Sequence, residues 1–185
     1  MKYMVMLFSF IYCSILIAQE GLQKFKTFDT DIVDFAISPD GTKIITGDDD
    51  RKICIWDLND SSLINFFTNF SDFETIECLS SNLFALKKGR DIIIWDINSC
   101  KLMHILKHAE DIVSFYPGVL NNSSLISCDE HNIYTWDLIN GNCNKHNYEE
   151  TIMAFDFNSV FQLAAVTLAD GKLMLFDTSK NEETM

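Results

Sequence analysis

The stretch SPDGTKIITGDDDRKICIWD, residues 38–57, combines two turn signals with two strand signals. The triplet Pro39-Asp40-Gly41 is typical of a tight turn, and Asp48-Asp49-Asp50 is typical of a solvated one. The runs KIIT and ICIW are rich in β-branched and aromatic residues, which favours strands. The stretch therefore predicts two strands joined by an acidic turn, the second of which closes on Trp56-Asp57.

The same pattern recurs three more times along the chain. Each segment ends in an apolar run that closes on an aromatic residue followed by Asp; these pairs are Trp56-Asp57, Trp95-Asp96, Trp136-Asp137 and Phe176-Asp177. The pairs are 39, 41 and 40 residues apart. Such even spacing predicts an internal repeat with segments at residues 35–59, 76–98, 112–140 and 152–179.

These repeats resemble the WD-repeat β-propeller family, in which units of about 40–45 residues carry a Trp-Asp signature and form four strands each. The resemblance covers residues 21–179. It implies an all-β fold, a β-propeller of four-stranded antiparallel blades with four WD-type repeats in a partial or self-completing ring. Packing physics agrees, because one sheet cannot bury both of its faces alone and radial stacking buries each sheet between two neighbours.

The resemblance also implies a hydrogen-bonded set in each blade. Its members are a Trp, an Asp six residues before it, a Ser or Thr on the preceding strand and a His in the loop that enters the blade. No repeat carries all four: Gly89 and Glu130 stand in place of the Asp, and Phe176 cannot donate a hydrogen bond. We expect the members that are present to be structural, in degenerate blades of modest stability: Thr46, Asp50, Trp56, Trp95, His108, Trp136, Asp170 and Phe176.

The two ends of the predicted propeller, residues 19–180, complement each other. Residues 21–28 are predicted to form the outer strand of a blade, whereas the last repeat is predicted to stop after its third strand near Ser179. Residues 181–185 are then a polar tail. Three arrangements follow: a four-bladed ring closed by its own ends, a homodimer with eight blades, or a piece of a longer protein.

Residues 1–18, MKYMVMLFSFIYCSILIA, carry Lys2 followed by an apolar run of 16 residues. A membrane span needs about 20, so the run predicts a secretory signal cleaved between Ala18 and Gln19. We therefore expect a secreted or extracytoplasmic chain without a membrane contact after cleavage. The cytoplasm is the alternative, because the five remaining cysteines are spread out and do not form a disulfide-scaffold pattern.

Composition excludes several functions. The 14 Lys and Arg against 27 Asp and Glu give a net charge of −13, which argues against a nucleic-acid partner. No G-x-S-x-G, H-E-x-x-H or Gly-rich phosphate motif occurs. Cys100, His104 and His108 fall along a predicted strand and loop, too far apart for one metal ion. We therefore predict no enzyme activity, no catalytic residue, no metal and no cofactor.

Charged residues concentrate in the loops that enter each blade and in the turns between second and third strands, which share one face in WD-repeat propellers. This face is predicted to be acidic with one basic sector, and to attract a protein or peptide partner, a basic one above all, in a salt-dependent way. Candidate partner-binding residues are Asp31, Asp48, Asp49, Asp72, Lys87, Lys88, Arg90, Glu110, Asp111, Asp129 and Glu149, with Asp29 and Glu150 beside them.

These observations predict a non-catalytic, exported WD-repeat propeller that acts as a protein- or peptide-binding scaffold. One alternative is an extracellular ligand-binding or catalytic propeller with its site in the central channel. The other is a fragment of a larger multidomain WD-repeat protein. Because the inference rests on the fold, it leaves the partner open.

Overall fold

The computed structural model describes residues 29–68, 72–118 and 123–184. Throughout these ranges the regular structure is β-strand, arranged in four antiparallel sheets of four consecutive strands each. The prediction of an all-β fold with four-stranded blades is confirmed. The predicted signal at residues 1–18 and the predicted strand at 21–28 lie outside the described residues. Within those that are described, no helix is long and apolar enough to cross a membrane.

Each sheet is a blade, numbered in chain order. Blade 1 contains β1 (Ile32–Ile37), β2 (Lys43–Asp48), β3 (Ile53–Asp57) and β4 (Leu63–Phe67), and blade 2 contains β5 (Thr75–Cys78), β6 (Leu83–Lys88), β7 (Asp91–Asp96) and β8 (Lys101–Lys107). Blade 3 contains β9 (Ile112–Pro117), β10 (Ser124–Asp129), β11 (Asn132–Asp137) and β12 (Asn142–Asn147), and blade 4 contains β13 (Ile152–Asn158), β14 (Leu163–Leu168), β15 (Leu173–Asp177) and β16 (Glu182–Thr184).

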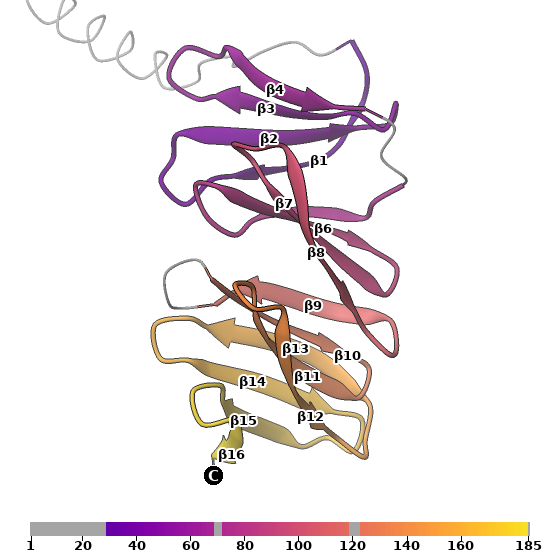
Figure 1. Cartoon of the computed structure of the whole chain (residues 1–185). Coiled ribbons are helices and arrows are strands. Elements are labelled where there is room, and N and C mark those ends of the chain that lie inside the picture. The colour runs from indigo at the N-terminus through magenta and orange to yellow at the C-terminus, as the bar shows by residue number, and fades with distance from the viewer. Residues whose placement is uncertain (1–28, 69–71, 119–122, 185) are drawn as a thin grey trace, which may run out of the picture.

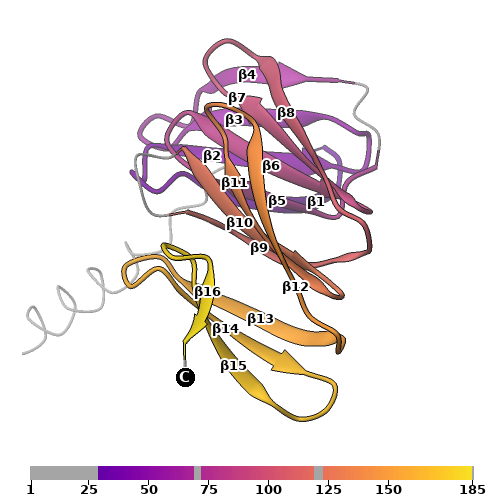
Figure 2. The ribbon, with the colours of Figure 1, turned by 60° about the horizontal axis from the view of Figure 1, so that its bottom comes forward.

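The blades are arranged in an arc (Figures 1 and 2). The first strands lie along its inside, with β1 in contact with β5 and β9 in contact with β13. The last strands of the two terminal blades, β4 and β16, lie at opposite ends of the molecule in Figure 1. The fold is therefore a fan of four sheets with their first strands at the centre.

Three hydrophobic clusters hold the fan together, one between each pair of consecutive blades. In blades 2, 3 and 4 the aromatic residue of the repeat faces the preceding blade. Trp95 packs on the cluster between blades 1 and 2, Trp136 belongs to the cluster between blades 2 and 3, and Phe176 to that between blades 3 and 4. Of the clusters formed by the described residues, none joins blade 4 to blade 1. Blade-to-blade packing is thus the main source of hydrophobic burial.

The Asp of each aromatic–Asp pair ends the third strand and closes the turn that follows. One carboxylate oxygen accepts a hydrogen bond, at 2.6–2.9 Å, from the backbone N–H two or three residues on. The fourth residue after the Asp then has a positive φ of 55–72°; these residues are Ser61, Cys100, Gly141 and Asn181. The repeated acidic residue therefore fixes the direction in which the fourth strand leaves.

The end of the chain differs from the sequence prediction. The last blade does not stop near Ser179, because β16 pairs with β15 at Leu175, Phe176 and Asp177. Glu183 of this strand also lies 3.5 Å from His146 in blade 3, measured from Oε1 to Nε2. The expected polar tail is thus a fourth strand, whose backbone forms the hydrogen bonds along the free edge of β15. Its three residues are all polar and therefore show no strand pattern in the sequence.

Candidate functional site

One end of the sheets carries the loops that enter the blades and the turns between second and third strands; we call it the loop face. Antiparallel pairing brings each loop to the adjacent turn. The N–H of Asp49 donates to the carbonyl of Asp31 at 3.1 Å, and the N–H of Ala169 donates to the carbonyl of Thr151 at 2.9 Å. The predicted grouping of these segments on one face is therefore observed.

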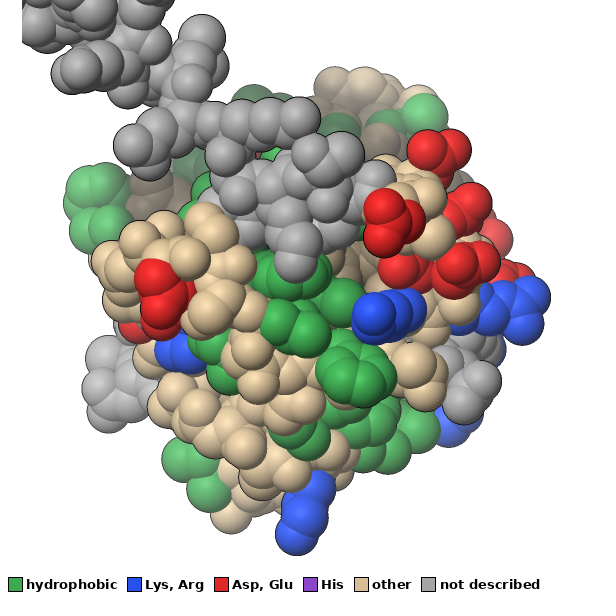
Figure 3. Space-filling model, turned by 90° about the horizontal axis from the view of Figure 1, so that it is seen from above, with side chains coloured by type: hydrophobic (Ala, Val, Ile, Leu, Met, Phe, Trp, Pro, Cys, Tyr) green, Lys and Arg blue, Asp and Glu red, His purple; other side chains and the backbone are tan. Residues whose placement is uncertain are grey.

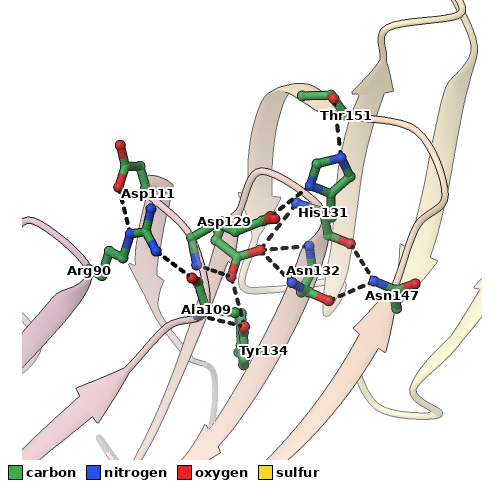
Figure 4. Close-up of polar contacts among 10 residues, drawn as sticks. Arg90, Ala109, Asp111, Asp129, His131, Asn132, Tyr134, Asn147 and Thr151 are labelled. Atoms are coloured by element: carbon green, nitrogen blue, oxygen red, sulfur yellow. Dashed lines mark hydrogen bonds and ion pairs between the residues drawn. The ribbon is translucent and has the colours of Figure 1, made fainter.

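Ion pairs neutralise most of the predicted basic sector. Arg90 Nε lies 2.9 Å from Asp111 Oδ1, and Arg90 also donates to the carbonyl of Ala109, so it links blade 2 to blade 3 (Figure 4). Lys87 Nζ lies 2.9 Å from Glu74 Oε2 within blade 2. The exposed Lys88 forms no ion pair within the part of the chain that the structure describes.

A further ion pair crosses the junction between blades 1 and 2. Arg51 Nε lies 3.0 Å from Asp72 Oδ1, and both side chains are largely exposed. Exposed pairs of this kind contribute little to stability, so their main effect here is to cancel charge. Four predicted partner-binding residues are consequently engaged within the chain: Asp72, Lys87, Arg90 and Asp111.

Asp129 is buried, not exposed as predicted (Figure 4). Its carboxylate accepts hydrogen bonds from the Tyr134 hydroxyl at 2.7 Å, from the Asn132 side chain at 2.7 Å and backbone at 2.8 Å, and from the backbone of His131 at 3.1 Å. Burial raises the pKa of Asp129, but these hydrogen bonds outweigh burial and leave the pKa below its ordinary value. Asp129 therefore holds the β10–β11 turn and is not available to a partner.

Asp48 has the corresponding role in blade 1. It stands opposite Ile32 as Asp129 stands opposite Ile112, and it accepts from the Thr30 hydroxyl at 3.1 Å and the backbone N–H of Lys52 at 2.8 Å. Sequence counting had assigned this role to Asp50, which is exposed in the turn. The count fails because four residues separate β2 from β3 and only two separate β10 from β11.

A buried polar chain crosses from blade 2 to the centre of blade 3. Trp136 Nε1 donates to Ser127 Oγ at 2.8 Å, and the same oxygen lies 2.8 Å from His108 Nε2. His108 Nδ1 lies 3.2 Å from the carbonyl oxygen of Arg90, which can only accept a hydrogen bond. The tautomer that fits both contacts therefore carries its proton on Nδ1, and its Nε2 accepts from the Ser127 hydroxyl. The structural roles predicted for His108 and Trp136 agree with this geometry, whereas Ser127 was missed.

His131 links blade 3 to blade 4 on the loop face (Figure 4). Its Nδ1 lies 2.7 Å from Glu110 Oε2 and its Nε2 lies 3.2 Å from Thr151 Oγ1. The hydrogen bond to Glu110 raises the pKa of His131. The side chains of Glu110, Glu130 and His131 place three potential metal-ligand atoms within 4.8 Å of one another, but both ring nitrogens of His131 already have hydrogen-bond partners. The predicted residue Glu110 thus belongs to a structural pair.

Comparison with known proteins agrees with this architecture. A sequence profile of the family described as "WD domain, G-beta repeat" matches residues 20–57. The solved structures "Structure of U3-55K" and "Crystal structure of RRP9 WD40 repeats" each superpose with a TM-score of 0.65 at 14% identity, over 88% of this chain. The chain is built of β-propeller blades with the fold seen in these WD40-repeat structures. It spans 53% and 52% of those two chains, about half of their length.

The similarity shows the fold of the WD-repeat blades and does not select a function. A comparison with curated proteins found no match to this sequence. In contrast, 1366 solved chains match its structure, and a fold by itself does not determine a function. The function has to be argued from the loop face itself.

The four blades differ in their internal hydrogen bonds. Blade 1 keeps the bond from Trp56 Nε1 to Thr46 Oγ1 at 3.0 Å. In the same register blades 2 and 4 carry Leu86 and Val166, which offer no hydroxyl to the aromatic residue of the blade. Asp170 closes the β14–β15 turn by accepting from the backbone N–H of Lys172 at 3.1 Å. Blades 2 and 4 therefore lack the hydroxyl that Thr46 supplies in blade 1, in agreement with the predicted degeneracy.

The exposed carboxylates of the loop face remain. Figure 3 looks onto the β4 edge of blade 1 and shows acidic side chains gathered at one end of the strands, with hydrophobic side chains across the middle. In residues 29–68, 72–118 and 123–184, the exposed acidic residues of this face that form no ion pair are Asp29, Asp31, Asp49, Asp50, Glu130, Glu149 and Glu150. They fall into two groups, one at blade 1 and one where blade 3 meets blade 4.

Proposed function

We propose that this chain is a non-catalytic scaffold that binds a protein or peptide through the acidic groups of its loop face. The observation that carries the proposal is the group Glu130, Glu149 and Glu150, which is exposed beside a rigid network. The backbone N–H of Ile152 donates to the carbonyl of Glu130 at 2.6 Å, and His131 is held from both sides. Exposed carboxylates beside a hydrogen-bonded backbone at a blade junction suit a partner that presents Lys or Arg.

The engagement of the two loop-face histidines supports a non-catalytic role. His108 and His131 each have both ring nitrogens within hydrogen-bond distance of internal partners. A general base needs a nitrogen that can reach the proton of a substrate. Their geometry fits residues that position loops better than residues that transfer protons.

A peptide-binding titration tests the proposal. The probe is a peptide of mixed Lys, Arg and Gly, and the variant replaces Glu130, Glu149 and Glu150 by Gln. We expect the affinity to fall at least about tenfold at low ionic strength, and the difference to shrink as salt screens the charges.

The matched control carries the same change in charge away from the loop face: Asp60→Asn, Glu77→Gln and Glu182→Gln. These residues are exposed in the β3–β4 turn, in β5 and in β16. The control should bind the peptide almost as tightly as the unmodified chain. An equal loss of affinity in the two triple variants would show that only the net charge of the chain matters, and it would overturn the proposed site.

We also propose that the chain is exported, on the basis of the apolar run that follows Lys2 and ends at Ala18. Expression in a secreting host followed by N-terminal sequencing tests this directly. Export predicts a product in the medium that starts at Gln19. A product that stays in the cell and starts at Met1 would refute it.

A further inference from the structure

Three side chains of the loop face lie close enough together to hold one metal ion. One carboxylate oxygen each of Glu110 and Glu130 and one ring nitrogen of His131 all lie within 4.8 Å of one another. Glu110 comes from the loop between β8 and β9, and the other two come from the turn between β10 and β11. Imidazole nitrogen and carboxylate oxygen are ligands that Zn²⁺ binds in proteins. The group therefore has the chemistry of a site for a divalent transition-metal ion.

The hydrogen bonds of His131 fit a metal ligand that exchanges one proton for the ion. Its Nδ1 lies 2.7 Å from Glu110 Oε2, and its Nε2 lies 3.2 Å from Thr151 Oγ1, a contact that Figure 4 shows. Because a hydroxyl oxygen also accepts, Nε2 can keep its proton and donate it to Thr151. An ion between Nδ1 and Glu110 then takes the place of the proton that joins them in the metal-free chain. Histidines that bind metals generally donate their other ring N–H to an oxygen in this way.

Small side-chain movements bring the three ligand atoms to bonding distance. Zinc bonds to nitrogen and oxygen are about 2.0–2.2 Å long, so two ligand atoms in a tetrahedral site lie about 3.3–3.6 Å apart. His131 Nδ1 and Glu110 Oε2, now 2.7 Å apart, therefore have to separate by about 0.6–0.9 Å. The oxygen of Glu130 has to approach by at most about 1.5 Å. Glu130 is exposed and Glu110 is half-buried, so both carboxylates can rotate without displacing the core.

Hydrogen bonds hold the backbone beneath the three ligands. The buried carboxylate of Asp129 accepts from the backbone N–H of His131 at 3.1 Å and from that of Glu110 at 3.3 Å. It therefore joins the two segments that carry the ligands. On the other side, the N–H of Ile152 in blade 4 donates to the carbonyl of Glu130 at 2.6 Å. A site whose backbone is ordered before binding loses less conformational entropy when the ion binds.

We infer that Glu110, Glu130 and His131 bind a divalent transition-metal ion, with Nδ1 of His131 and one oxygen of each glutamate as the ligands. Water completes the coordination, as it does in zinc sites with three protein ligands. The two carboxylates and the neutral imidazole together balance the charge of the ion. The prediction of no metal rested on sequence motifs, and Glu110 and His131, which are 21 residues apart, form none.

Calorimetric titration of the full chain with zinc chloride tests the inference. The titration needs no peptide, so its outcome does not depend on the proposed scaffold function. The expected stoichiometry is one ion per chain. Glu110→Gln and His131→Ala should each weaken zinc binding at least about tenfold, because each removes a ligand. Thr151→Val should weaken it by about tenfold, since the outer partners of metal ligands typically contribute about 10–100-fold.

Two matched controls lie outside the ligand group. Glu149→Gln makes the same change of charge on the loop face as Glu110→Gln. Cys143→Ser removes the exposed thiol, which is another potential zinc ligand. Both controls should bind zinc as tightly as the unmodified chain, and circular dichroism should show the same strand content in every variant.

Nitrogen NMR of the imidazole rings identifies the ligand atom. Zinc should shift the Nδ1 resonance of His131 and leave its Nε2 protonated, a change that a purely structural histidine would not show. This measurement uses the unmodified chain, so it decides the question even if a variant fails to fold. A chain that takes up no zinc, zinc uptake without a shift at His131 Nδ1, or a control that loses as much affinity as Glu110→Gln would each overturn the inference.

Discussion

Replacement of Ser127 by Ala removes the centre of the buried polar chain in blade 3. Ser127 is fully buried, and its hydroxyl joins Trp136 Nε1 and His108 Nε2, each at 2.8 Å. The change deletes one oxygen atom and leaves the indole N–H and the imidazole nitrogen without this partner. Each buried polar group that loses its partner costs about 1–3 kcal/mol, so the loss at two groups should lower the free energy of unfolding of Ser127→Ala by about 2–6 kcal/mol.

Such a loss is a large part of the stability of a domain, which is typically about 5–15 kcal/mol. Urea unfolding followed by tryptophan fluorescence measures it. With a slope of about 1–3 kcal/mol per molar urea, the midpoint should fall by about 1 M or more. The slope should stay unchanged if the surface exposed on unfolding is the same.

Thr46→Val provides the internal comparison. The Thr46 hydroxyl accepts one hydrogen bond, from Trp56 Nε1 at 3.0 Å, and valine keeps the shape of the side chain. Its cost should be about half that of Ser127→Ala. A Ser127→Ala variant that loses less than about 0.5 kcal/mol would show that the hydroxyl contributes little, and the reasoning from the network would be refuted.

Three further predictions concern histidine titration, turn geometry and thiol access. Burial lowers the pKa of His108 below 6.5, so the stability that neutral His108 contributes is lost as pH drops below 6.5. The hydrogen bond to Glu110 raises the pKa of His131, so the stability that protonated His131 contributes is present below pH 6.5 and is lost as pH rises through the raised pKa. NMR titration midpoints of the two histidines on the same side of 6.5 would contradict this prediction. Ser61 and Gly141 occupy the same turn position with positive φ of 60° and 72°, which strains a residue that has a Cβ. Thermal unfolding should therefore show Ser61→Gly as neutral or stabilising and Gly141→Ala as destabilising by about 1–2 kcal/mol. The reverse order would refute backbone strain at this position. Of the five cysteines in the described residues, Cys143 alone is exposed, so it should react first with a maleimide even though desolvation raises its pKa. Peptide mapping that finds faster labelling of a buried cysteine would contradict the positions of these thiols.

The third strand of each blade could be predicted from sequence because its signal is local. The pairs that begin at Trp56, Trp95, Trp136 and Phe176 mark strands that end at the following Asp in every blade. The aromatic residue fills a space between two blades, and the Asp closes a turn of fixed length. Both requirements act on adjacent residues, so the spacing of about 40 residues survives variation elsewhere.

The polar network could not be predicted to the same extent because it depends on turns of different length. Counting six residues back from Trp136 reaches Glu130, whereas the buried carboxylate belongs to Asp129; in blade 1 the same count reaches Asp50 in place of Asp48. Register relative to the first strand, which only the folded sheet reveals, fixes this position.

The basic sector was predicted as exposed charge because sequence does not show contacts between blades. Arg90 and Asp111 are 21 residues apart, and only the stacking of blade 3 on blade 2 brings them to 2.9 Å. Likewise β16 is three polar residues long and is recognisable only by its pairing with β15. Sequence thus predicted the unit, and the packing between units determined which charges remain free.

The claim at the centre of this account is that consecutive blades bury their apolar faces against one another. A crystal structure of the purified chain tests it most directly. The account predicts four blades in chain order, with Trp95, Trp136 and Phe176 each packed against the preceding blade. Blades in which these three side chains are open to solvent would contradict it.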